Sequence, residues 1–370
     1  MIRALHIFSG FGGGISSLIL NLAQNKADDI CFDTMAFTYK NGEHFVNAIT
    51  SGGGRCFTMP RPRKKGVIAF QRFVEQVIRQ GQYDVVHCHL SGWMIIPFAK
   101  VAKRQGVKKL IIHAHTSHDE NWISRIPVVH RLGQKLNYKW ADVYMTCSDL
   151  AASYVFGDFY LGKKGVTLIP NGMNKENFSV VVSQQDKEEL RRALNIPDHA
   201  RLVGHVGRFN TPKNHDKILE IAQATVRKDP NIRFLLIGVG ERMDEIRKKA
   251  AKKDLKDVVY FLGRRTDISK LMQLFDVMIL PSFFEGLPTV AIECQASGTP
   301  MLISDFVTRQ CDMGLGLTQF LPIADAELWA QTILETMDQS VNPEYCLEMI
   351  DKNGFTAKTA GTLYSSCVRE

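Results

Sequence analysis

The 370-residue sequence has no apolar run of the roughly 18–20 residues that a membrane-spanning helix needs. It also has no Cys-x-x-C pair, because its eight cysteines are scattered along the chain. Scattered cysteines favour reduced thiols in a cytosolic protein over a disulfide framework or a cysteine zinc site. Residues 1–5 lead directly into a strand-like run, so we expect no signal peptide and a cytoplasmic location.

An acidic excess is absent from the first half of the chain. Residues 1–180 contain 22 Lys and Arg against 12 Asp and Glu, a net of +10, whereas residues 181–370 contain 24 against 26, a net of −2. The basic half predicts contact with an anionic surface, or a face whose charge only keeps the protein soluble. With 45% hydrophobic and 23% charged residues, the chain is long enough for two globular domains.

The chain contains a repeated alternation of short apolar runs and segments with helical spacing, which predicts an α/β fold. The first strand is expected at residues 4–9. A glycine turn with Gly12, Gly13 and Gly14 follows it and leads into a helical run. Glycine between a strand and a helix lets the backbone approach a ligand closely. The spacing is not the G-x-G-x-x-G of a nicotinamide-binding domain.

The rest of the first half continues this pattern. Strands are expected at residues 32–38, 55–59, 84–90, 110–113, 143–147 and 166–169, and helices at residues 42–48, 69–80 and 95–105 and within 122–140. Residues 60–66 (PRPRKKG) predict a basic loop that is either solvated or in contact with an anionic surface. Helical spacing places Arg131, Lys135 and Lys139 on one face. Ser148 is the expected N-cap of a further helix.

Two of these strands end in histidines. His87 and His89 end one strand, and His113 and His115, followed by Thr116, end the next. Residues two apart on a strand point to one face, so we expect both strand ends to open into one cleft. We expect His87 and His113 to be packed inside the domain. The set has no His-x-x-x-His pair on a helix and no paired cysteines, which argues against zinc.

The second half follows a polar linker expected near residues 172–184. Strands are predicted at residues 202–206, 234–238, 258–263, 276–282 and 301–304, and helices after the first two of them and at 288–297, 329–337 and 343–366. Arg208 and Lys213 flank the turn after the first of these strands, next to a helix N-terminus. Such a turn suits a diphosphate, because Arg binds two oxygens at once and Lys acts as a point charge.

Two carboxylates lie near the end of the strand expected at residues 276–282. Glu285 lies in the turn after residues 276–282, Pro288 begins a helix, and Glu293 lies one to two turns inside it. Ligands of open parallel sheets bind at this edge, where carboxylates accept hydrogen bonds from sugar or ribose hydroxyls. Taken alone, the two residues are equally compatible with an ordinary strand–helix unit that carries two solvated glutamates.

The run E-G-L-P-T-V-A-I-E, from Glu285 to Glu293, followed by A-S-G-T-P, resembles the glutamate-seven-glutamate signature of a large family of retaining glycosyltransferases. This is glycosyltransferase family 4, or glycosyl transferases group 1, which has the GT-B architecture. Five further motifs occur in the family's order: a glycine turn, His-x-His, His-Thr, Pro-Asn-Gly and Gly-Arg…Lys. The resemblance covers nearly the whole chain, and several segments are similar to the bacterial capsule and exopolysaccharide branch.

The resemblance implies two Rossmann-like parallel-sheet domains that face each other across a cleft. Residues 1–178 are then the acceptor-side domain and residues 185–345 bind the nucleotide sugar. Residues 346–370 are expected to be a helical segment that can cross back to the first domain. The N-terminal turn lacks the glutamate that is common there in the family, and this departure puts the acceptor contacts in doubt.

The implied activity is a retaining hexosyl transfer from a nucleotide sugar, expected to be a UDP-sugar, to a glycan or lipid-linked acceptor in surface polysaccharide biosynthesis. The implied catalytic residues are His115 and Glu285. The implied donor-binding residues are Gly13, Gly14, Arg208, Lys213, Gly263, Arg264, Gly286, Leu287, Thr289 and Glu293, and the acceptor-side residues are His89 and Thr116. Because no Asp-x-Asp motif points to a metal, we expect no cofactor, and the cations and helix amides would neutralise the leaving diphosphate.

Two other functions remain compatible with the sequence. A sugar-nucleotide epimerase or hydrolase on the same architecture would act without an acceptor. A non-catalytic partner would have lost charged site residues, but all four that the family uses are present. We further expect peripheral attachment of the basic first domain to the anionic inner face of the cell membrane, and no nucleic-acid partner.

Overall fold

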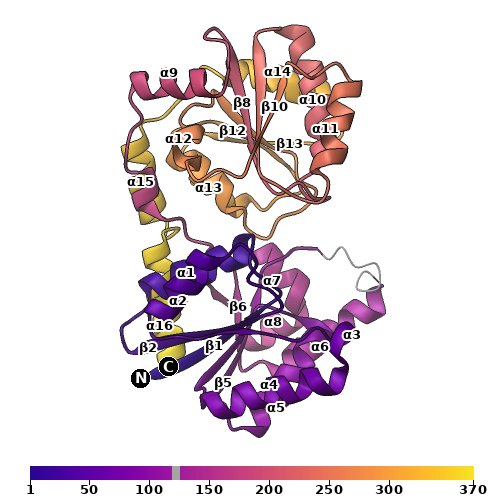
Figure 1. Cartoon of the computed structure of the whole chain (residues 1–370), viewed down its shortest axis with the longest axis vertical. Helices are drawn as coiled ribbons and strands as arrows, with labels where there is room; N and C mark the ends of the chain where they lie inside the picture. Colours follow the sequence, from indigo (N-terminus) through magenta and orange to yellow (C-terminus); the bar gives the residue numbers. More distant parts are fainter. Residues whose placement is uncertain (119–125) are drawn as a thin grey trace. The chain divides into compact units, whose positions relative to one another are not determined.

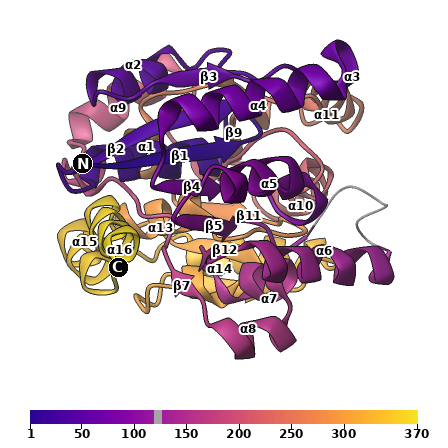
Figure 2. The same ribbon diagram turned by 90° about the horizontal axis from the view of Figure 1, so that it is seen from below.

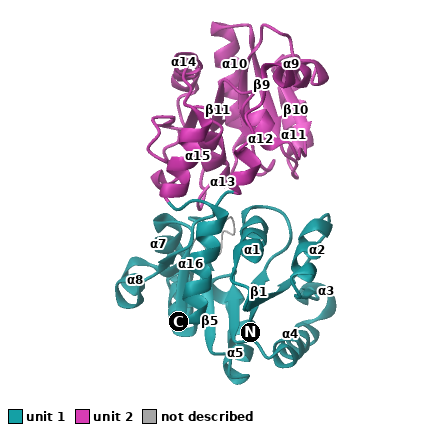
Figure 3. Cartoon of the chain, turned by 90° about the vertical axis from the view of Figure 1, so that its left-hand side faces the viewer, with its two compact units in different colours: residues 1–173, 354–370 teal, residues 174–353 magenta. Residues whose placement is uncertain are grey.

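The computed structural model describes residues 1–118 and 126–370 of the chain. They form two compact units, which are coloured separately in Figure 3. The first unit contains residues 1–173 together with residues 354–370, and the second contains residues 174–353. The chain therefore returns to its first unit after it has completed the second. None of the described helices has the length and apolar character needed to cross a bilayer.

The first unit is built on a parallel sheet of seven strands (Figure 1). The strands are β1 (Ile2–Phe8), β2 (Ile30–Ala36), β3 (Cys56–Thr58), β4 (Val85–Cys88), β5 (Lys109–Ala114), β6 (Val143–Thr146) and β7 (Thr167–Leu168). Their spatial order is β3-β2-β1-β4-β5-β6-β7, so the direction of winding changes between β1 and β4. Ligands of open α/β sheets bind outside the carboxyl ends of the strands at such a point.

The helices that connect the strands cover both faces of this sheet, because right-handed crossovers on the two sides of β1 place them on opposite faces. They are α1 (Gly14–Asn25), α2 (Glu43–Ser51), α3 (Pro62–Lys65), α4 (Val67–Gly81), η1 (Gly92–Ile95), α5 (Ile96–Arg104), α6 (Pro127–Trp140), α7 (Asp149–Phe156) and α8 (Asp158–Lys164). Helices α4 and α5 pack against each other (Figure 2). The C-terminal helix α16 (Ala357–Arg369) packs along α1, where Gly361 leaves no space for a Cβ atom beside the Asn25 carbonyl.

The second unit has a parallel sheet of six strands in the order β10-β9-β8-β11-β12-β13. The strands are β8 (Arg201–Val206), β9 (Ile232–Ile237), β10 (Val259–Gly263), β11 (Val277–Leu280), β12 (Met301–Ser304) and β13 (Thr318–Leu321). The helices are η2 (Lys175–Phe178), α9 (Gln184–Ala193), α10 (His215–Lys228), α11 (Met243–Lys252), α12 (Ile268–Met272), α13 (Thr289–Ala296), η3 (Arg309–Cys311), α14 (Ala326–Thr336) and α15 (Pro343–Lys352).

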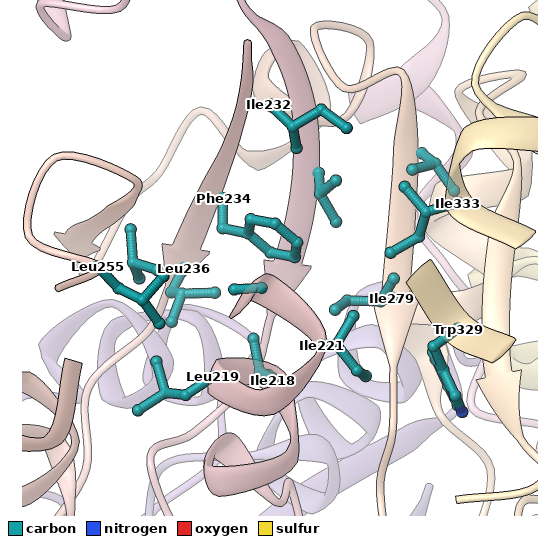
Figure 4. Packing of buried hydrophobic residues seen from close by; sticks show 14 of the residues in the cluster. Ile218, Leu219, Ile221, Ile232, Phe234, Leu236, Leu255, Ile279, Trp329 and Ile333 are labelled. Atoms are coloured by element: carbon teal, nitrogen blue, oxygen red, sulfur yellow. The ribbon is translucent and has the colours of Figure 1, made fainter. Parts of the chain in front are cut away.

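The core of the second unit explains why its strands are continuous apolar runs. Phe234 and Ile279 from the sheet pack against Ile218 of α10 and Trp329 of α14, and all four side chains are fully buried (Figure 4). A parallel strand that is covered by helices on both faces has no solvent-facing side, so polar residues do not alternate along it. Strand β11 (VMIL) is buried at every position.

The predicted fold class is confirmed, since both units are doubly wound parallel sheets. The segment boundaries differ from the expected ones. Residues 346–370 are not one segment, because α15 belongs to the second unit and α16 to the first. The expected linker contains η2, and the expected basic loop contains the helical turn α3. The start of the helix expected within residues 122–140 lies outside the described residues. Ser148 caps α7, as predicted, by accepting a hydrogen bond from the Ala151 amide at 3.2 Å.

Candidate functional site

An ion pair joins two of the predicted site residues at the carboxyl edge of the second sheet. The Nζ atom of Lys213 lies 2.6 Å from Oε1 of Glu285, and only about 15% of either side chain is exposed. The Ser282 hydroxyl donates to the same carboxylate oxygen at 2.7 Å. Lys213 follows β8, and Ser282 and Glu285 follow β11. These strands are neighbours in the sheet, so residues 72 positions apart in sequence meet at its edge.

Close packing fixes the turn that carries Lys213. A Cβ atom on Gly207 would lie 3.1 Å from Cδ of Lys213 and 2.8 Å from Nε2 of His205, so only glycine leaves room for the lysine stem there. The Asn214 amide donates to the Pro281 carbonyl at 3.1 Å, which ties this turn to the one after β11. The ammonium and the carboxylate are therefore presented together by two joined turns.

Arg208 lies in the same turn as Lys213 but has a different partner. Its guanidinium forms an ion pair of 3.0 Å with Glu241, and about 60% of each side chain is exposed. Exposed pairs of this kind contribute little to stability, so Arg208 can exchange Glu241 for another anion at small cost. The sequence analysis missed Glu241. It follows β9, the neighbour of β8, so its position at the same sheet edge was the available signal.

Glu293 lies on α13, the helix that begins after the Glu285 turn. Its carboxyl is in a desolvated environment, and this burial raises its pKa to about 7. The predicted residues Gly286, Leu287 and Thr289 form the turn and the first residue of the same helix, and Leu287 is buried. The carboxyl of Glu293 is therefore poised between its neutral and charged forms near neutral pH, where hydrogen bonds from hydroxyls would favour the charged form.

The last two predicted donor-binding residues of the second unit, Gly263 and Arg264, lie at the end of β10, the strand next to β9. Gly263 ends β10 with a φ of +66°, and its carbonyl accepts a hydrogen bond from the Gly238 amide at 2.8 Å. Arg264 is exposed at the same edge. The strand ends of β10, β9, β8 and β11 thus present, in this spatial order, Arg264, Glu241, Arg208 with Lys213, and Glu285.

The glycine turn of the first unit lies between β1 and α1. Gly13 is the N-cap of α1 and has a φ of +104°, in a region that side chains of L-residues rarely adopt. Apart from its two chain neighbours, no atom of the described residues lies within 4 Å of the position that its Cβ atom would take. The turn therefore leaves space beside the N-terminus of α1, where Gly14 is the first helical residue.

Five histidines occupy one face of the first sheet, from β1, β4 and β5 and the residues that follow β4 and β5. His6, His87, His89 and His113 are buried, and His115 is half-buried. One of them, His6, was not predicted from the sequence. In the structure, the parallel register of β1 and β4 places it beside His87. Ring nitrogens connect the set in two groups. His6 Nδ1 lies 3.1 Å from His89 Nε2, and His89 Nδ1 lies 2.7 Å from His115 Nε2. Separately, His113 Nδ1 lies 3.3 Å from His87 Nε2.

These histidines are neutral at physiological pH. Burial lowers the pKa of both His6 and His115 to about 3, and it lowers the pKa values of the other three well below their usual range. His87 and His113 are packed inside the unit, as expected.

The two predicted acceptor-side residues have other roles in the structure. Both ring nitrogens of His89 are engaged by His6 and His115, and its side chain is almost fully buried, so it lies behind His115 and offers no nitrogen to an acceptor. The Thr116 hydroxyl donates to the His118 carbonyl and accepts from the His118 amide, and it therefore shapes the turn after β5.

Among the described residues, two sets of these histidines have possible metal-ligand atoms within 4.8 Å of one another. One set is His6, His87 and His89, and the other is His89, His113 and His115. Both sets require His89, whose two nitrogens already hydrogen-bond to other imidazoles. A metal ion would have to replace at least one of these hydrogen bonds, so the two uses of the cluster exclude each other.

Comparison with known proteins identifies the family. The model for Glycosyltransferase Family 4 matches residues 12–177, and the model for Glycosyl transferases group 1 matches residues 186–340. Putative glycosyltransferase EpsF of Bacillus subtilis (strain 168) is 32% identical over 339 residues, which are 90% of this chain and 86% of the relative. The chain belongs to this glycosyltransferase family.

Further comparisons agree with this glycosyltransferase assignment. An Escherichia coli relative, UDP-Gal:alpha-D-GlcNAc-diphosphoundecaprenol alpha-1,3-galactosyltransferase, is 25% identical over 75% of this chain and 71% of its own length. The crystal structure of Anabaena HepE in complex with UDP covers 100% of both chains with a TM-score of 0.78 and 18% identity. Sucrose-phosphate synthase from Thermosynechococcus elongatus gives a TM-score of 0.74 at 19% identity, over 100% of this chain and 98% of its own. The predicted family and its GT-B fold are confirmed.

Proposed function

We propose that this glycosyltransferase moves a hexose from a UDP-sugar to a lipid-linked or glycan acceptor with retention of configuration, in surface polysaccharide biosynthesis. The observation that carries the proposal is the Lys213–Glu285 pair, held by two joined turns at the edge where the family signature lies. An ammonium there suits a diphosphate, and a carboxylate there suits a sugar. The name of the E. coli relative, which specifies a diphosphoundecaprenol-linked acceptor, supports the acceptor class.

The residues then have separate roles in one reaction. Lys213 and Arg208 neutralise the leaving diphosphate, so that no metal ion is required and added chelator leaves the rate unchanged. Glu293 accepts hydrogen bonds from the ribose hydroxyls. Glu285 acts at the donor sugar, and His115 donates to one of its hydroxyls.

The direct test is a transfer assay with the purified protein. A panel of UDP-sugars is combined with undecaprenyl-diphosphate-linked sugars, and the anomeric configuration of the product is read by NMR. Acceptor-dependent product with the configuration of the donor supports the proposal. Free sugar formed without an acceptor would instead favour the hydrolase, and interconversion of the donor sugar would favour the epimerase. Binding of a donor without any turnover would favour the non-catalytic partner.

The raised pKa of Glu293 predicts a pH dependence of donor binding. The Glu293 carboxyl binds two ribose hydroxyls in its charged form. Below about pH 7 this carboxyl is protonated in the free enzyme, so donor binding then requires the loss of a proton. Donor affinity should therefore be constant well above pH 7 and fall by up to about tenfold per pH unit below it. Isothermal titration with a UDP-sugar, whose diphosphate does not titrate near neutrality, measures this profile. Glu293→Gln should bind more weakly and give a flat profile, whereas a flat profile in the wild type would contradict the role.

The first unit carries two exposed surfaces on which basic and apolar side chains lie together, and we propose that they attach the enzyme to an anionic membrane. The first surface consists of Arg61, the N-cap of α3, of Arg63, Lys64 and Lys65 within α3, and of Val67 and Ile68, which follow after Gly66 and are about 60% exposed. The second surface, on α6, combines exposed Val128 and Leu132 with the predicted basic face, which is exposed. The joint presence of both kinds of side chain favours an interfacial contact over a face that only keeps the protein soluble.

Sedimentation with liposomes tests this attachment. Each basic residue near an anionic surface contributes roughly 1 kcal/mol, screened over about 8–10 Å, so binding should need anionic lipid and decrease with salt. Neutralising four residues of the first surface together, Arg61, Arg63, Lys64 and Lys65, should lower binding by up to about a thousandfold at low salt. The matched control neutralises four exposed basic residues of the second unit: Arg192, Lys248, Lys252 and Lys256. Equal binding to neutral and anionic vesicles, or no binding to either at low salt, would refute the proposal.

A further inference from the structure

The histidine chain of the first unit ends on a tyrosine from the opposite end of the sequence. Tyr364 lies on α16, is fully buried, and its hydroxyl is 3.2 Å from His6 Nε2. The three hydrogen bonds in series therefore run from Tyr364 to His6, His89 and His115. Tyr364 also packs its ring against Phe32 and His87, so the helix holds the hydroxyl in place.

The Tyr364 hydroxyl bears on which atom donates the hydrogen in each bond of this series. The hydroxyl has one hydrogen bond within the described residues, the one to His6, so either direction of the series leaves one donor unmet: the Tyr364 O–H or the His115 Nδ1–H. Tyr364 is fully buried, whereas His115 is half-buried and follows β5 at the carboxyl edge of the sheet, so only the His115 end can meet a ligand. The direction that a ligand can complete is the one in which the hydroxyl donates and His6 Nε2 accepts. A neutral imidazole has one N–H, and His6 therefore carries its hydrogen on Nδ1. That N–H donates to His89 Nε2, and by the same rule the Nδ1–H of His89 donates to His115 Nε2.

We propose that Tyr364 is a positioning residue that fixes His115, through His6 and His89, as the tautomer with its hydrogen on Nδ1. Among the residues that the structure describes, no group hydrogen-bonds to His115 Nδ1, and this atom is buried. A buried N–H without a partner is stabilised when the oxygen of a ligand accepts its hydrogen bond. Nδ1 is therefore the atom of His115 that donates to a sugar hydroxyl. The direction rests on a ligand that reaches the His115 end, and the use of the tautomer in catalysis rests on the proposed function.

The neighbouring pair, His113 and His87, has no comparable constraint. Its outer nitrogens, His87 Nδ1 and His113 Nε2, have no hydrogen-bond partner within residues 1–118 and 126–370. Either direction of the bond between them leaves one outer N–H unmet, and no ligand can complete either direction, because both side chains are buried. The pair therefore serves as an internal comparison, because only the group attached to Tyr364 is expected to have a single tautomer.

NMR of protein labelled with ¹⁵N-histidine tests the assignment without any need for turnover, because nitrogens with and without hydrogen have well-separated shifts. The wild type should show hydrogen on Nδ1 of His6, His89 and His115, with signals assigned through single His→Gln variants. Tyr364→Phe keeps the ring but removes the donor, so His115 should become a mixture or change to Nε2–H. The matched control is Tyr144→Phe, which removes a buried hydroxyl that has no partner in the described structure and should leave all tautomers unchanged.

Two NMR results would overturn the inference. One is hydrogen on Nε2 of His115 in the wild type, and the other is an unchanged Nδ1–H in Tyr364→Phe. The first needs no variant, so a folding defect cannot hide it. Stoichiometric metal in the purified protein would also overturn it, because a metal ion would have to break the chain at His89.

The kinetic consequence separates this inference from the proposed function. Tyr364→Phe should lower kcat about two- to tenfold, the range of one neutral hydrogen bond, and leave the KM for the donor unchanged. If the tautomers follow the expectation but no glycosyl transfer is found, only the proposed function fails. If transfer is found and His115 has the other tautomer, only the inference fails.

Discussion

Replacing Glu285 by Gln should lower kcat by about a hundredfold or more without weakening nucleotide binding. The Glu285 carboxylate is fixed by Lys213 at 2.6 Å and by Ser282 at 2.7 Å, so its charge is presented in a single position. A prearranged charge that faces the reacting centre contributes about 10²–10³ in rate when it acts mainly on the transition state. Glutamine has the same shape and retains an oxygen for both contacts, so the substitution removes the charge and little else.

Steady-state kinetics of the transfer reaction measure this effect. Glu327→Gln is a suitable control, because Glu327 forms an exposed ion pair with Arg227 in the same unit and should tolerate the change. Thermal unfolding of both variants is followed in parallel, since Glu285→Gln leaves the Lys213 ammonium without its anion. A Glu285→Gln enzyme with full turnover would show that this carboxylate does not act at the sugar.

The fold was predictable from the sequence where the structure buries both faces of a strand. Strands β8, β11 and β12 are apolar runs because helices cover them on both sides, and the glycine turns and caps mark their ends. The missed strand β13 is an edge strand with half-buried residues, so its sequence, TQFL, has a mixed character. The short helices α8 and α12 have too few turns to show a period.

The members of the candidate site were predictable one at a time, but their pairing was not. Glu285 and Lys213 each stand at a recognisable strand end, and the family signature assigns them to one site. Their ion pair depends on β8 and β11 being neighbours, which local spacing does not contain. The same reason explains why the ion pair of Arg208 with Glu241, which follows the neighbouring strand β9, was not predicted.

The histidine chain shows this limit most clearly. His89 and His115 were visible as strand-end residues, but His6 lies inside β1 and looks like an ordinary core residue. Tyr364 comes from a helix that returns from the end of the chain, 358 positions away from His6. Only the sheet register and the docking of α16 on the first unit place these four side chains in contact.

Replacing Lys213 by Ala should weaken UDP binding by about 10- to 150-fold, which corresponds to about 1.5–3 kcal/mol for a charge-assisted contact. The loss should be larger than for Arg208→Ala, because Lys213 is mostly buried and held in place, whereas Arg208 is about 60% exposed. Titration calorimetry with UDP and with uridine locates the contact, since only UDP binding should suffer if Lys213 meets the diphosphate. Arg227→Ala, which breaks an exposed pair on α10, is the control. UDP affinity unchanged in both Arg208→Ala and Lys213→Ala would refute the diphosphate site.

The Lys213–Glu285 pair also predicts the sign of the coupling between these substitutions. Glu285 and the diphosphate compete for the same ammonium, so Glu285→Gln should leave UDP affinity equal to or higher than that of the wild type. Lys213→Ala should remove this gain, because the competition needs the lysine. The effects on UDP binding in the double variant should therefore not add, as expected for residues in direct contact. Additive effects would mean that Lys213 binds the diphosphate independently of Glu285, and that the ion pair plays no part in donor binding.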